Sequence, residues 1–426
     1  MKSLMNFVAA LLAFAGMAQE KPGFVKVEWS EKGGETWTVE GLRDREAGVP
    51  MATNTVFAIC SNTKPISSVL VLTFVEEGVL DLDDPVAKHL PAFADIRLKG
   101  QPPKQVLTLR HLLTHLSGLA YGAAAPGRNG DMTSYAEQAR IAVEKGLSYE
   151  PGEKYKYCGL GFQVMGAVLE KVTGRKAYDL MRERIFEPLG MTETTFYPDA
   201  ALLARTAVPY YFPPDGGAPV KYAFENRWTA PLGNPARTAM LSGGLFSTVG
   251  DYLKFSQMMA RRGVGLNGRR VLKEETFDAY LATRQTPPGD KVDASFDIAF
   301  NRDRTGGGKG GLFATSAQWD WKARSCAVVF RAKSPYAPKG VKSALDATGF
   351  GGKKTSFAVS ETKVEDGRAS CRVGNCEDRH GIGTVELFVN GASAGTRRVE
   401  LAIGEVKRVE FRTAVKPGDA VEFKVR

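Results

Sequence analysis

The sequence predicts two folded units: a mixed α/β (α+β) domain over residues 22–348 and a small β-sandwich over residues 349–426. Two observations predict the first unit: apolar helical runs mixed with short apolar strands, and a chain length that suits two domains. A third observation predicts the second unit. After residue 348, the glycine-rich linker 349–354 is followed by short alternating strands with Asn-Gly and Pro-Gly turns. That pattern is typical of a small, Ig-like β-sandwich.

The composition is that of an ordinary globular protein. Of the 426 residues, 43% are hydrophobic and 24% are charged, which excludes wholesale disorder. The formal net charge is +10, but no block of lysine and arginine is interleaved with aromatic residues. We therefore predict no nucleic-acid partner.

The N-terminus carries the features of a secretory signal peptide over residues 1–18. Lys2 precedes an apolar run over residues 7–17, and the small residues Gly16 and Ala18 stand where cleavage is expected. The run is too short to cross a bilayer, and no later segment is long enough. We expect an exported protein, periplasmic or extracellular, with no integral membrane segment after removal of the signal.

The elements of the first domain follow from local pattern. The predicted strands cover residues 23–29, 35–40, 56–59, 312–321 and 325–332, and the predicted helices cover 66–78, 109–116, 134–145, 160–172 and 251–261. Residues 206–237, rich in Pro, Gly and aromatics, predict a long loop. The glycine cluster 306–311 is expected to lead into the last two strands, which fit the edge of a sheet.

In the second domain, the predicted strands are short and regularly spaced. They cover residues 356–359, 369–373, 384–389, 397–402, 406–412 and 421–425. Cys371 and Cys376 are close enough to bridge a turn, but five cysteines leave at least one thiol outside any intramolecular pair. The fold does not depend on a disulfide framework.

A candidate nucleophile stands at the start of the helix that follows residue 59. Ser61 and Lys64 form a Ser-x-x-Lys pattern, and positions i and i+3 share one helical face, so Lys64 can reach the Ser61 hydroxyl. A serine hydroxyl is a poor nucleophile until a base takes its proton. Alone the pattern is weak, because a capping serine and a solvated lysine would look the same.

Three more motifs occur in a fixed order with it: His111–Leu119, Tyr155–Gly159 before the helix at 160, and Lys309–Gly311. With all four, the chain resembles the serine β-lactamase and penicillin-binding-protein superfamily, in its class C β-lactamase-like and esterase-like branch, over about residues 50–335. The resemblance implies a serine β-lactamase-like fold: an antiparallel sheet flanked by helices, plus an all-helical lobe, with a cleft between them.

The resemblance also implies roles for individual residues. Ser61 corresponds to the acylated nucleophile, and Lys64 and Tyr157 to the residues that move its proton. Lys309 corresponds to the first residue of Lys-Thr-Gly, which lines the cleft with positive potential, and Gly159 and Gly311 belong to the same substrate-binding motifs. The oxyanion hole would consist of the N–H groups of Ser61 and Leu312.

Simple electrostatics agrees with these roles. Deprotonating an ordinary lysine at pH 7 costs about 4.6 kcal/mol. Burial and a second cation both lower that cost, and Lys309 across the cleft would be such a cation for Lys64. A helix N-terminus at Ser61 would favour a developing oxyanion.

Two departures from the family motifs affect the expected substrate. Gly159 replaces the asparagine of Tyr-x-Asn, and Gly310 replaces the threonine of Lys-Thr-Gly. The missing amide and hydroxyl favour an esterase-like or D-peptide hydrolase over a β-lactamase. Lys309 nevertheless retains a positive charge that could bind a substrate carboxylate, so carboxylate-bearing substrates are still possible.

Other motifs predict no chemistry. Residues 391–395 match Gly-x-Ser-x-Gly, but strand-like residues flank them on both sides, which predicts a hairpin turn. His111 and His115 have the i, i+4 spacing of a zinc helix without its glutamate, so hydrogen bonding near the cleft is the favoured role. We expect no metal and no cofactor.

The sequence therefore predicts a secreted serine hydrolase that forms an acyl-enzyme on Ser61 with ester or amide substrates. The partner would be a small molecule or a peptide, a class that includes cell-wall fragments. D,D-carboxypeptidase, D-aminopeptidase and β-lactamase activities stay open within the superfamily. The alternative from another class is a non-catalytic penicillin-binding-like or cell-surface binding protein that uses the same cleft.

Overall fold

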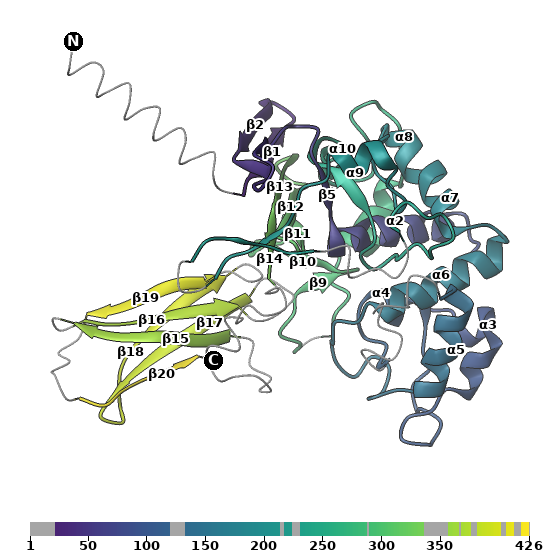
Figure 1. The fold of residues 1–426 in the computed structure, drawn as a ribbon. Helices are drawn as coiled ribbons and strands as arrows, with labels where there is room; N and C mark the ends of the chain where they lie inside the picture. The colour runs from purple at the N-terminus through teal and green to yellow at the C-terminus, as the bar shows by residue number, and fades with distance from the viewer. Residues whose placement is uncertain are drawn as a thin grey trace, which may run out of the picture.

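The computed structural model describes most of the chain (Figure 1). The described residues are 22–119, 133–213, 217–223, 231–287, 289–335, 357–365, 368–375, 381–401, 406–412 and 419–425. The predicted signal peptide and the linker 349–354 lie outside them and stay predictions, as does the domain boundary at residue 349. No helix among these residues is long and apolar enough to cross a membrane.

A seven-stranded antiparallel sheet forms the centre of the first domain. Its order is β2-β1-β13-β12-β11-β10-β9. The strands are β1 (Phe24–Ser30), β2 (Gly34–Glu40), β9 (Ala294–Ser295), β10 (Ile298–Phe300), β11 (Gly306–Gly311), β12 (Thr315–Asp320) and β13 (Ser325–Arg331). The N-terminal hairpin therefore pairs with the last strand of the domain, Phe24 lying opposite Arg331. This arrangement confirms the predicted α+β fold.

Two helices connect this sheet to the rest of the domain. In α2 (Thr63–Glu76) every residue up to Phe74 is buried, including the polar Lys64, Ser67, Ser68 and Thr73. Helix α10 (Val249–Ala260) packs on β13, β12 and β1. In Figure 1, α2 runs between the sheet and a group of helices on its far side.

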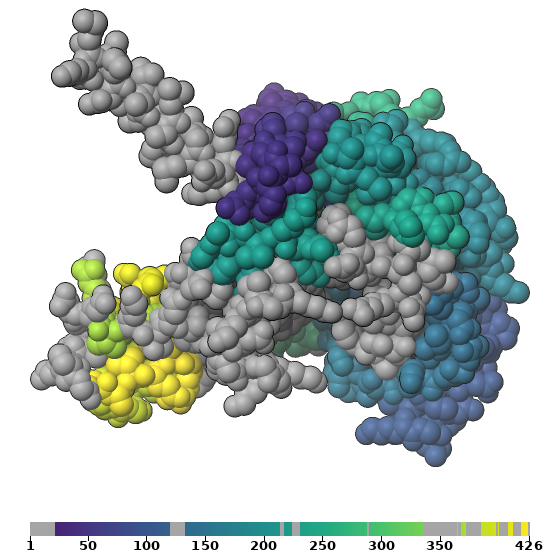
Figure 2. Space-filling model, in the orientation of Figure 1, coloured from purple at the N-terminus to yellow at the C-terminus, as the bar shows by residue number. Residues whose placement is uncertain are grey.

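That group is the helical lobe that the sequence predicts. It contains α3 (Val86–His89), α4 (Leu109–Leu113), α5 (Tyr135–Lys145) and α6 (Leu160–Thr173). Helix α6 packs on the other three and on α2. In Figure 2 the lobe, in blue, forms the lower right of the molecule, away from the purple β1–β2 hairpin at the top.

Shorter elements complete the domain. They are β3 (Leu42–Asp44), β4 (Val49–Pro50), β5 (Val56–Ala58), β6 (Tyr210–Tyr211), β7 (Val220–Lys221), β8 (Phe246–Thr248), β14 (Lys333–Ser334), α7 (Ala177–Met181), α8 (Glu187–Leu189), α9 (Ala200–Ala204) and α11 (Glu274–Thr276). Single 3₁₀ or π turns are η1 (Cys60–Asn62), η2 (Pro91–Asp95), η3 (Arg182–Phe186) and η5 (Phe277–Leu281).

The prediction for the glycine cluster 306–311 is wrong. It does not lead into a strand but is itself strand β11, and Leu312–Ala314 form the turn into β12. Strands β12 and β13 are also interior strands of the sheet, not edge strands. Glycine has low strand propensity and no side chain to pattern, so the ladder partners β10 and β12 decide this conformation.

The C-terminal strands form two three-stranded sheets, ordered β15-β16-β19 and β18-β17-β20. Their bounds are β15 (Phe357–Glu365), β16 (Arg368–Asn375), β17 (Gly381–Val389), β18 (Ala392–Leu401), β19 (Val406–Arg412) and β20 (Val421–Val425). One buried cluster joins the two sheets, with Phe411 from one and Phe423 from the other. This is the packing of a sandwich.

Two smaller expectations concern this unit. The Asn390-Gly391 pair has positive φ angles of 51° and 82° and joins β17 to β18, so the Gly-x-Ser-x-Gly motif is a hairpin as predicted. Cys371 is a free, buried thiol, so it makes no bridge. Its suggested partner Cys376 lies outside the part of the chain that the structure describes.

Candidate active site

Ser61 lies on the η1 turn, between β5 and α2. The residue before it, Cys60, has φ of 48°, a left-handed conformation that costs a non-glycine residue on the order of 1–3 kcal/mol. Ser61 is partly exposed, whereas Asn62, Thr63 and Lys64 are buried. The turn therefore presents the hydroxyl to solvent while it anchors the following residues in the core.

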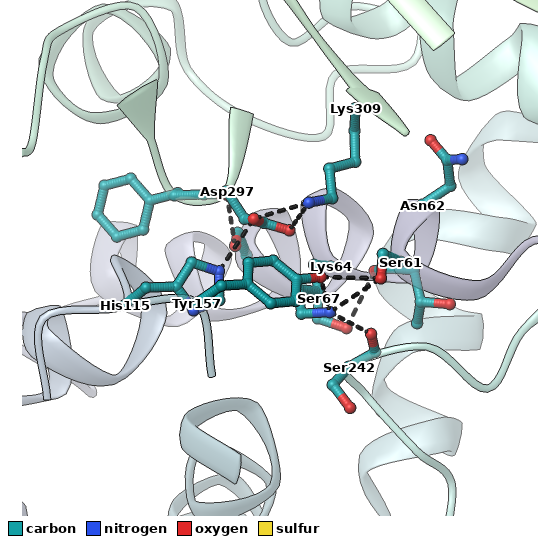
Figure 3. Close-up of polar contacts among 12 residues, drawn as sticks. Ser61, Asn62, Lys64, Ser67, His115, Tyr157, Ser242, Asp297 and Lys309 are labelled. Carbon is teal, nitrogen blue, oxygen red and sulfur yellow. Dashed lines mark hydrogen bonds and ion pairs between the residues drawn. The ribbon is translucent and has the colours of Figure 1, made fainter. Parts of the chain in front are cut away.

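Lys64 lies three residues after Ser61, and its Nζ contacts the Ser61 hydroxyl. Its Nζ is 3.3 Å from Ser61 Oγ, 2.5 Å from the Tyr157 hydroxyl and 2.6 Å from the Ser242 carbonyl oxygen (Figure 3). The residue is only 2% exposed. Its Nζ is therefore largely removed from bulk water and contacts three oxygen atoms.

Tyr157 completes a hydrogen-bonded triangle with these two residues. Its hydroxyl donates to Ser61 Oγ over 2.8 Å. The Ser242 carbonyl can only accept, so it takes one N–H of Lys64 in either protonation state. When Lys64 is neutral, its lone pair can then accept a proton from the Ser61 or the Tyr157 hydroxyl. The three predicted catalytic residues are thus placed together with a route for the proton.

A second polar group surrounds Lys309, the first residue of the third motif. Lys309 Nζ lies 2.8 Å from the carboxylate of Asp297, and the same carboxylate accepts from His115 Nε2 over 2.9 Å. His115 Nδ1 accepts from the N–H of Cys158, next to Tyr157, over 3.1 Å. These contacts link the His111–Leu119, Tyr155–Gly159 and Lys309–Gly311 motifs.

The charges in this group are set by burial and pairing. Burial alone would raise the pKa of Asp297, but the Lys309 ammonium and His115 hold it well below its ordinary value. Burial lowers the pKa of His115 below 6.5, against the opposing influence of Asp297. Near neutral pH the group is therefore a lysine–carboxylate ion pair beside a neutral histidine.

This ion pair corrects the predicted electrostatics. Lys309 lines the site and its Nζ lies 4.6 Å from the centre of the Tyr157 ring, as a cleft residue should. The Asp297 carboxylate, however, offsets the positive potential that the sequence assigned to Lys309. The second cation that the sequence predicts opposite Lys64 is thus itself paired with a carboxylate.

Asp297 was missed because nothing in its local sequence marks it. It stands in the two-residue turn between β9 and β10, where Phe296 and Asp297 have φ of 43° and 66°. Phenylalanine rarely adopts such a conformation. Its ring is fully buried and packs edge-on against Tyr280, which holds the turn in place. The strained turn directs Asp297 towards the site.

Gly159 lies beside Ser242, the residue whose carbonyl holds Lys64. A Cβ at Gly159 would stand 3.1 Å from Ser242 Oγ and 3.3 Å from its Cβ, tighter than most such contacts. The serine side chain thus occupies space next to the position where the family motif has asparagine. Among the described residues, the Ser242 hydroxyl has no hydrogen-bond partner.

The end of β11 and the start of β12 pack closely against the η1 turn that carries Ser61, which we call the nucleophile turn (Cys60–Asn62). A Cβ at Gly311 would lie 2.4 Å from the Ile59 carbonyl oxygen, so only glycine fits this approach. Thr315 donates to that same oxygen over 3.0 Å and accepts from Asn62 Nδ2 over 2.9 Å. Leu312 therefore follows β11 close to the nucleophile turn, where the predicted oxyanion role of its N–H stays a prediction.

Both histidines singled out in the sequence make hydrogen bonds. Within the described ranges, no group of three or more His, Cys, Asp or Glu side chains could hold a metal ion. His111 caps α4, where its Nδ1 accepts from the Thr108 N–H over 3.2 Å. His115 bonds Asp297, as above. Both therefore take the hydrogen-bonding role that the sequence favoured.

Comparison with known proteins agrees with this geometry. The family described as Beta-lactamase matches residues 12–347. Esterase EstB of Burkholderia gladioli is 39% identical over 40% of this chain and 46% of that protein. Penicillin-binding protein 4 of Amycolatopsis lactamdurans is 30% identical over 54% of this chain and 58% of that protein. The chain spans less than two thirds of either relative.

Solved structures show the same fold. The octameric penicillin-binding protein homologue from Pyrococcus abyssi aligns with a TM-score of 0.62 and 20% identity, over 99% of both chains. EstCE1, a hydrolase with promiscuous acyltransferase activity, aligns with a TM-score of 0.60 and 21% identity, over 78% of this chain and 94% of that one. At these identities the likeness concerns the fold alone.

Proposed function

Because this chain belongs to the β-lactamase family, in its class C-like and esterase branch, we propose that it is a hydrolase that cleaves an ester or amide through an acyl-enzyme on Ser61. The observation that carries the proposal is the hydrogen-bonded triangle of Ser61, Lys64 and Tyr157. A binding protein would have no need to keep a buried lysine in contact with a serine hydroxyl.

The first half of the reaction follows from these contacts. Ser61 Oγ attacks the carbonyl carbon while its proton passes to Tyr157 or directly to Lys64. The carbonyl oxygen becomes an oxyanion, which the N–H groups of Ser61 and Leu312 would stabilise. Collapse breaks the bond to the leaving group, which takes a proton from the Tyr157 hydroxyl, and an acyl-serine results.

The second half reverses these roles with water as the nucleophile. Water adds to the acyl carbonyl and gives its proton to the Tyr157–Lys64 pair. The bond to Ser61 Oγ breaks, and Ser61 recovers a proton from the same pair. Besides the substrate and water, these steps use the three side chains and the backbone N–H groups of the proposed oxyanion hole.

Esterase activity is the favoured form of this chemistry. Gly159 offers no amide for the acylamino carbonyl that a β-lactam or D-peptide carries. Gly310 likewise offers no hydroxyl for a substrate carboxylate. EstB, the relative with the highest identity reported above, is named as an esterase.

We also propose that the protein works outside the cytoplasm. The support is the signal-like segment 1–18, with its basic start, apolar run and small residues before the expected cleavage site. Secretion of the full chain, with N-terminal sequencing of the exported form, tests this. A retained N-terminus on cytoplasmic protein would contradict it.

A substrate panel tests the activity. Initial rates would be measured with p-nitrophenyl butyrate, a D-alanyl-D-alanine peptide and a penicillin, for the wild type and Ser61→Ala. We expect Ser61-dependent turnover of the butyrate, and little or none of the other two. Faster penicillin turnover would make the protein a β-lactamase, and peptide turnover alone would make it a carboxypeptidase.

A further inference from the structure

The pairing of Lys309 bears on the substrate class of the proposed Ser61 hydrolase. Lys309 Nζ is within 2.8 Å of both oxygens of Asp297. The lysine side chain is 11% exposed and the aspartate 2% exposed. The cation that borders the reaction site is therefore matched, on its buried side, by a fixed negative charge.

Asp297 is held in the charged state and in this position from two directions. The neutral His115, fully buried, donates its Nε2–H to the carboxylate. The backbone turn at Phe296 and Asp297 is fixed by the buried Phe296 ring and by a 3.3 Å hydrogen bond from Ser68 Oγ to the Phe296 carbonyl. Asp297 cannot simply turn away when a ligand approaches Lys309.

A substrate carboxylate that reached Lys309 would therefore meet two opposed effects. The ammonium attracts it, but its binding would bring a second carboxylate within a few ångströms of Asp297. A fixed carboxylate next to a binding position repels ligands that carry a carboxylate, even when a cation such as Lys309 lies beside it. An uncharged group at the same place meets no such repulsion.

We propose that Asp297 sets the charge specificity of the site: it disfavours substrates that carry a carboxylate beside the scissile bond and so selects uncharged esters. Asp297 touches no reacting atom, so it is a specificity-determining residue that acts through Lys309. Lys309 in turn is a fixed cation beside the Tyr157 ring, which His115 also contacts at a centroid distance of 4.5 Å.

The test uses two matched esters of hippuric acid, one with lactate and one with lactamide. They differ only in a carboxylate against a carboxamide next to the ester oxygen. We expect the wild type to hydrolyse the lactamide ester with a kcat/KM at least about tenfold higher. Asp297→Asn, which can still accept from His115, should raise the relative kcat/KM of the lactate ester by about tenfold, mainly through KM.

Combining Lys309→Met with Asp297→Asn supplies a second test, in which neither charge of the pair is left buried without its partner. If the Asp297 carboxylate repels the lactate ester, the double variant should still hydrolyse that ester with a higher relative kcat/KM than the wild type. A lower relative kcat/KM for the lactate ester in the double variant would overturn the proposal, because Lys309 would then bind the carboxylate. An unchanged ratio in a folded Asp297→Asn variant would overturn it as well.

The inference rests on the proposed hydrolase, and the two can fail separately. If a fluorophosphonate does not label Ser61 of the wild type and neither ester is cleaved, the hydrolase itself is refuted, and the specificity proposal with it. If Ser61 is labelled and both esters are cleaved with equal kcat/KM in wild type and variants, only the role of Asp297 is refuted.

Discussion

The Tyr157 hydroxyl donates a hydrogen bond of 2.8 Å to Ser61 Oγ while it accepts one from Lys64 Nζ. The serine proton therefore has two neighbouring atoms to which it can move, the Tyr157 hydroxyl oxygen and the Lys64 nitrogen. This relationship joins residues 96 positions apart, from the nucleophile turn and from the loop before α6.

The hydroxyl of Tyr157 should be essential for turnover, and its ring should not. Tyr157→Phe keeps the aromatic contacts with Lys309 and His115 but removes the proton carrier. General acid–base groups contribute about 10²–10⁴-fold, so kcat for an ester should fall by that factor. Melting temperature and fluorophosphonate labelling would be measured beside kcat. An unchanged kcat would show that Lys64 moves the proton alone.

Gly159 and Ser242 should behave as a coupled pair. Gly159→Ala places a Cβ 3.1 Å from Ser242 Oγ, and a shift of Ser242 would disturb the carbonyl that holds Lys64. We expect kcat to fall several-fold in Gly159→Ala and to recover in Gly159→Ala with Ser242→Gly. A double-mutant cycle on kcat measures the coupling. Additive effects in the two variants would contradict the proposed contact.

Gly311 should not tolerate any side chain. A Cβ there would lie 2.2 Å from Thr315 Oγ1 and 2.4 Å from the Ile59 carbonyl oxygen, so Gly311→Ala must separate β11 from the nucleophile turn. We expect loss of activity and a lower melting temperature. Gly250→Ala is the matched control, because its Cβ would meet nothing closer than 3.8 Å. Full activity in Gly311→Ala would show that the two segments can separate freely.

Acid should destabilise the protein through His115. The pKa of His115 in the folded protein is below the ordinary 6.5. Below pH 6.5 the unfolded chain therefore binds a proton at this histidine that the folded protein does not bind. This contribution to stability is complete above pH 6.5 and is lost as the pH falls through the folded value. His111, whose pKa burial also lowers, acts in the same direction.

Thermal unfolding between pH 8 and 5 measures this effect. Each 1 kcal/mol of stability moves the melting temperature of such a domain by about 2–4 °C. The fall in melting temperature on acidification should be smaller in His115→Gln than in the wild type, each compared with its own value at pH 8. Asp297 does not interfere, because its lowered pKa affects stability only below about pH 3.8. Equal falls would contradict the buried neutral histidine.

Much of this site could be predicted from the sequence because its signals are local. Ser61 and Lys64 are three positions apart at the start of a largely apolar run, so the sequence predicts the helix and marks the two residues as a candidate pair. The other three motifs were needed to favour catalysis over a capping serine and a solvated lysine. The hairpin at Asn390-Gly391 is likewise encoded in two residues. Tyr157 and Lys309 needed the additional information of a family resemblance.

The parts that could not be predicted depend on contacts between distant segments. Strand β11 consists only of glycines and one lysine, so its conformation is imposed by β10 and β12. Asp297 is an aspartate in a tight turn, with no local feature that sets it apart. Only the fold shows that it lies against Lys309 from β11 and His115 from the loop after α4.

The most direct test of the account is the intact mass of the protein after exposure to a fluorophosphonate. The wild type should gain one adduct, and peptide mapping should place it on Ser61. Ser67→Ala, which changes the next serine along the chain, in α2, should label like the wild type, whereas Ser61→Ala should not label. An adduct that persists in Ser61→Ala, or no adduct in the folded wild type, would contradict the assignment of Ser61 as the nucleophile.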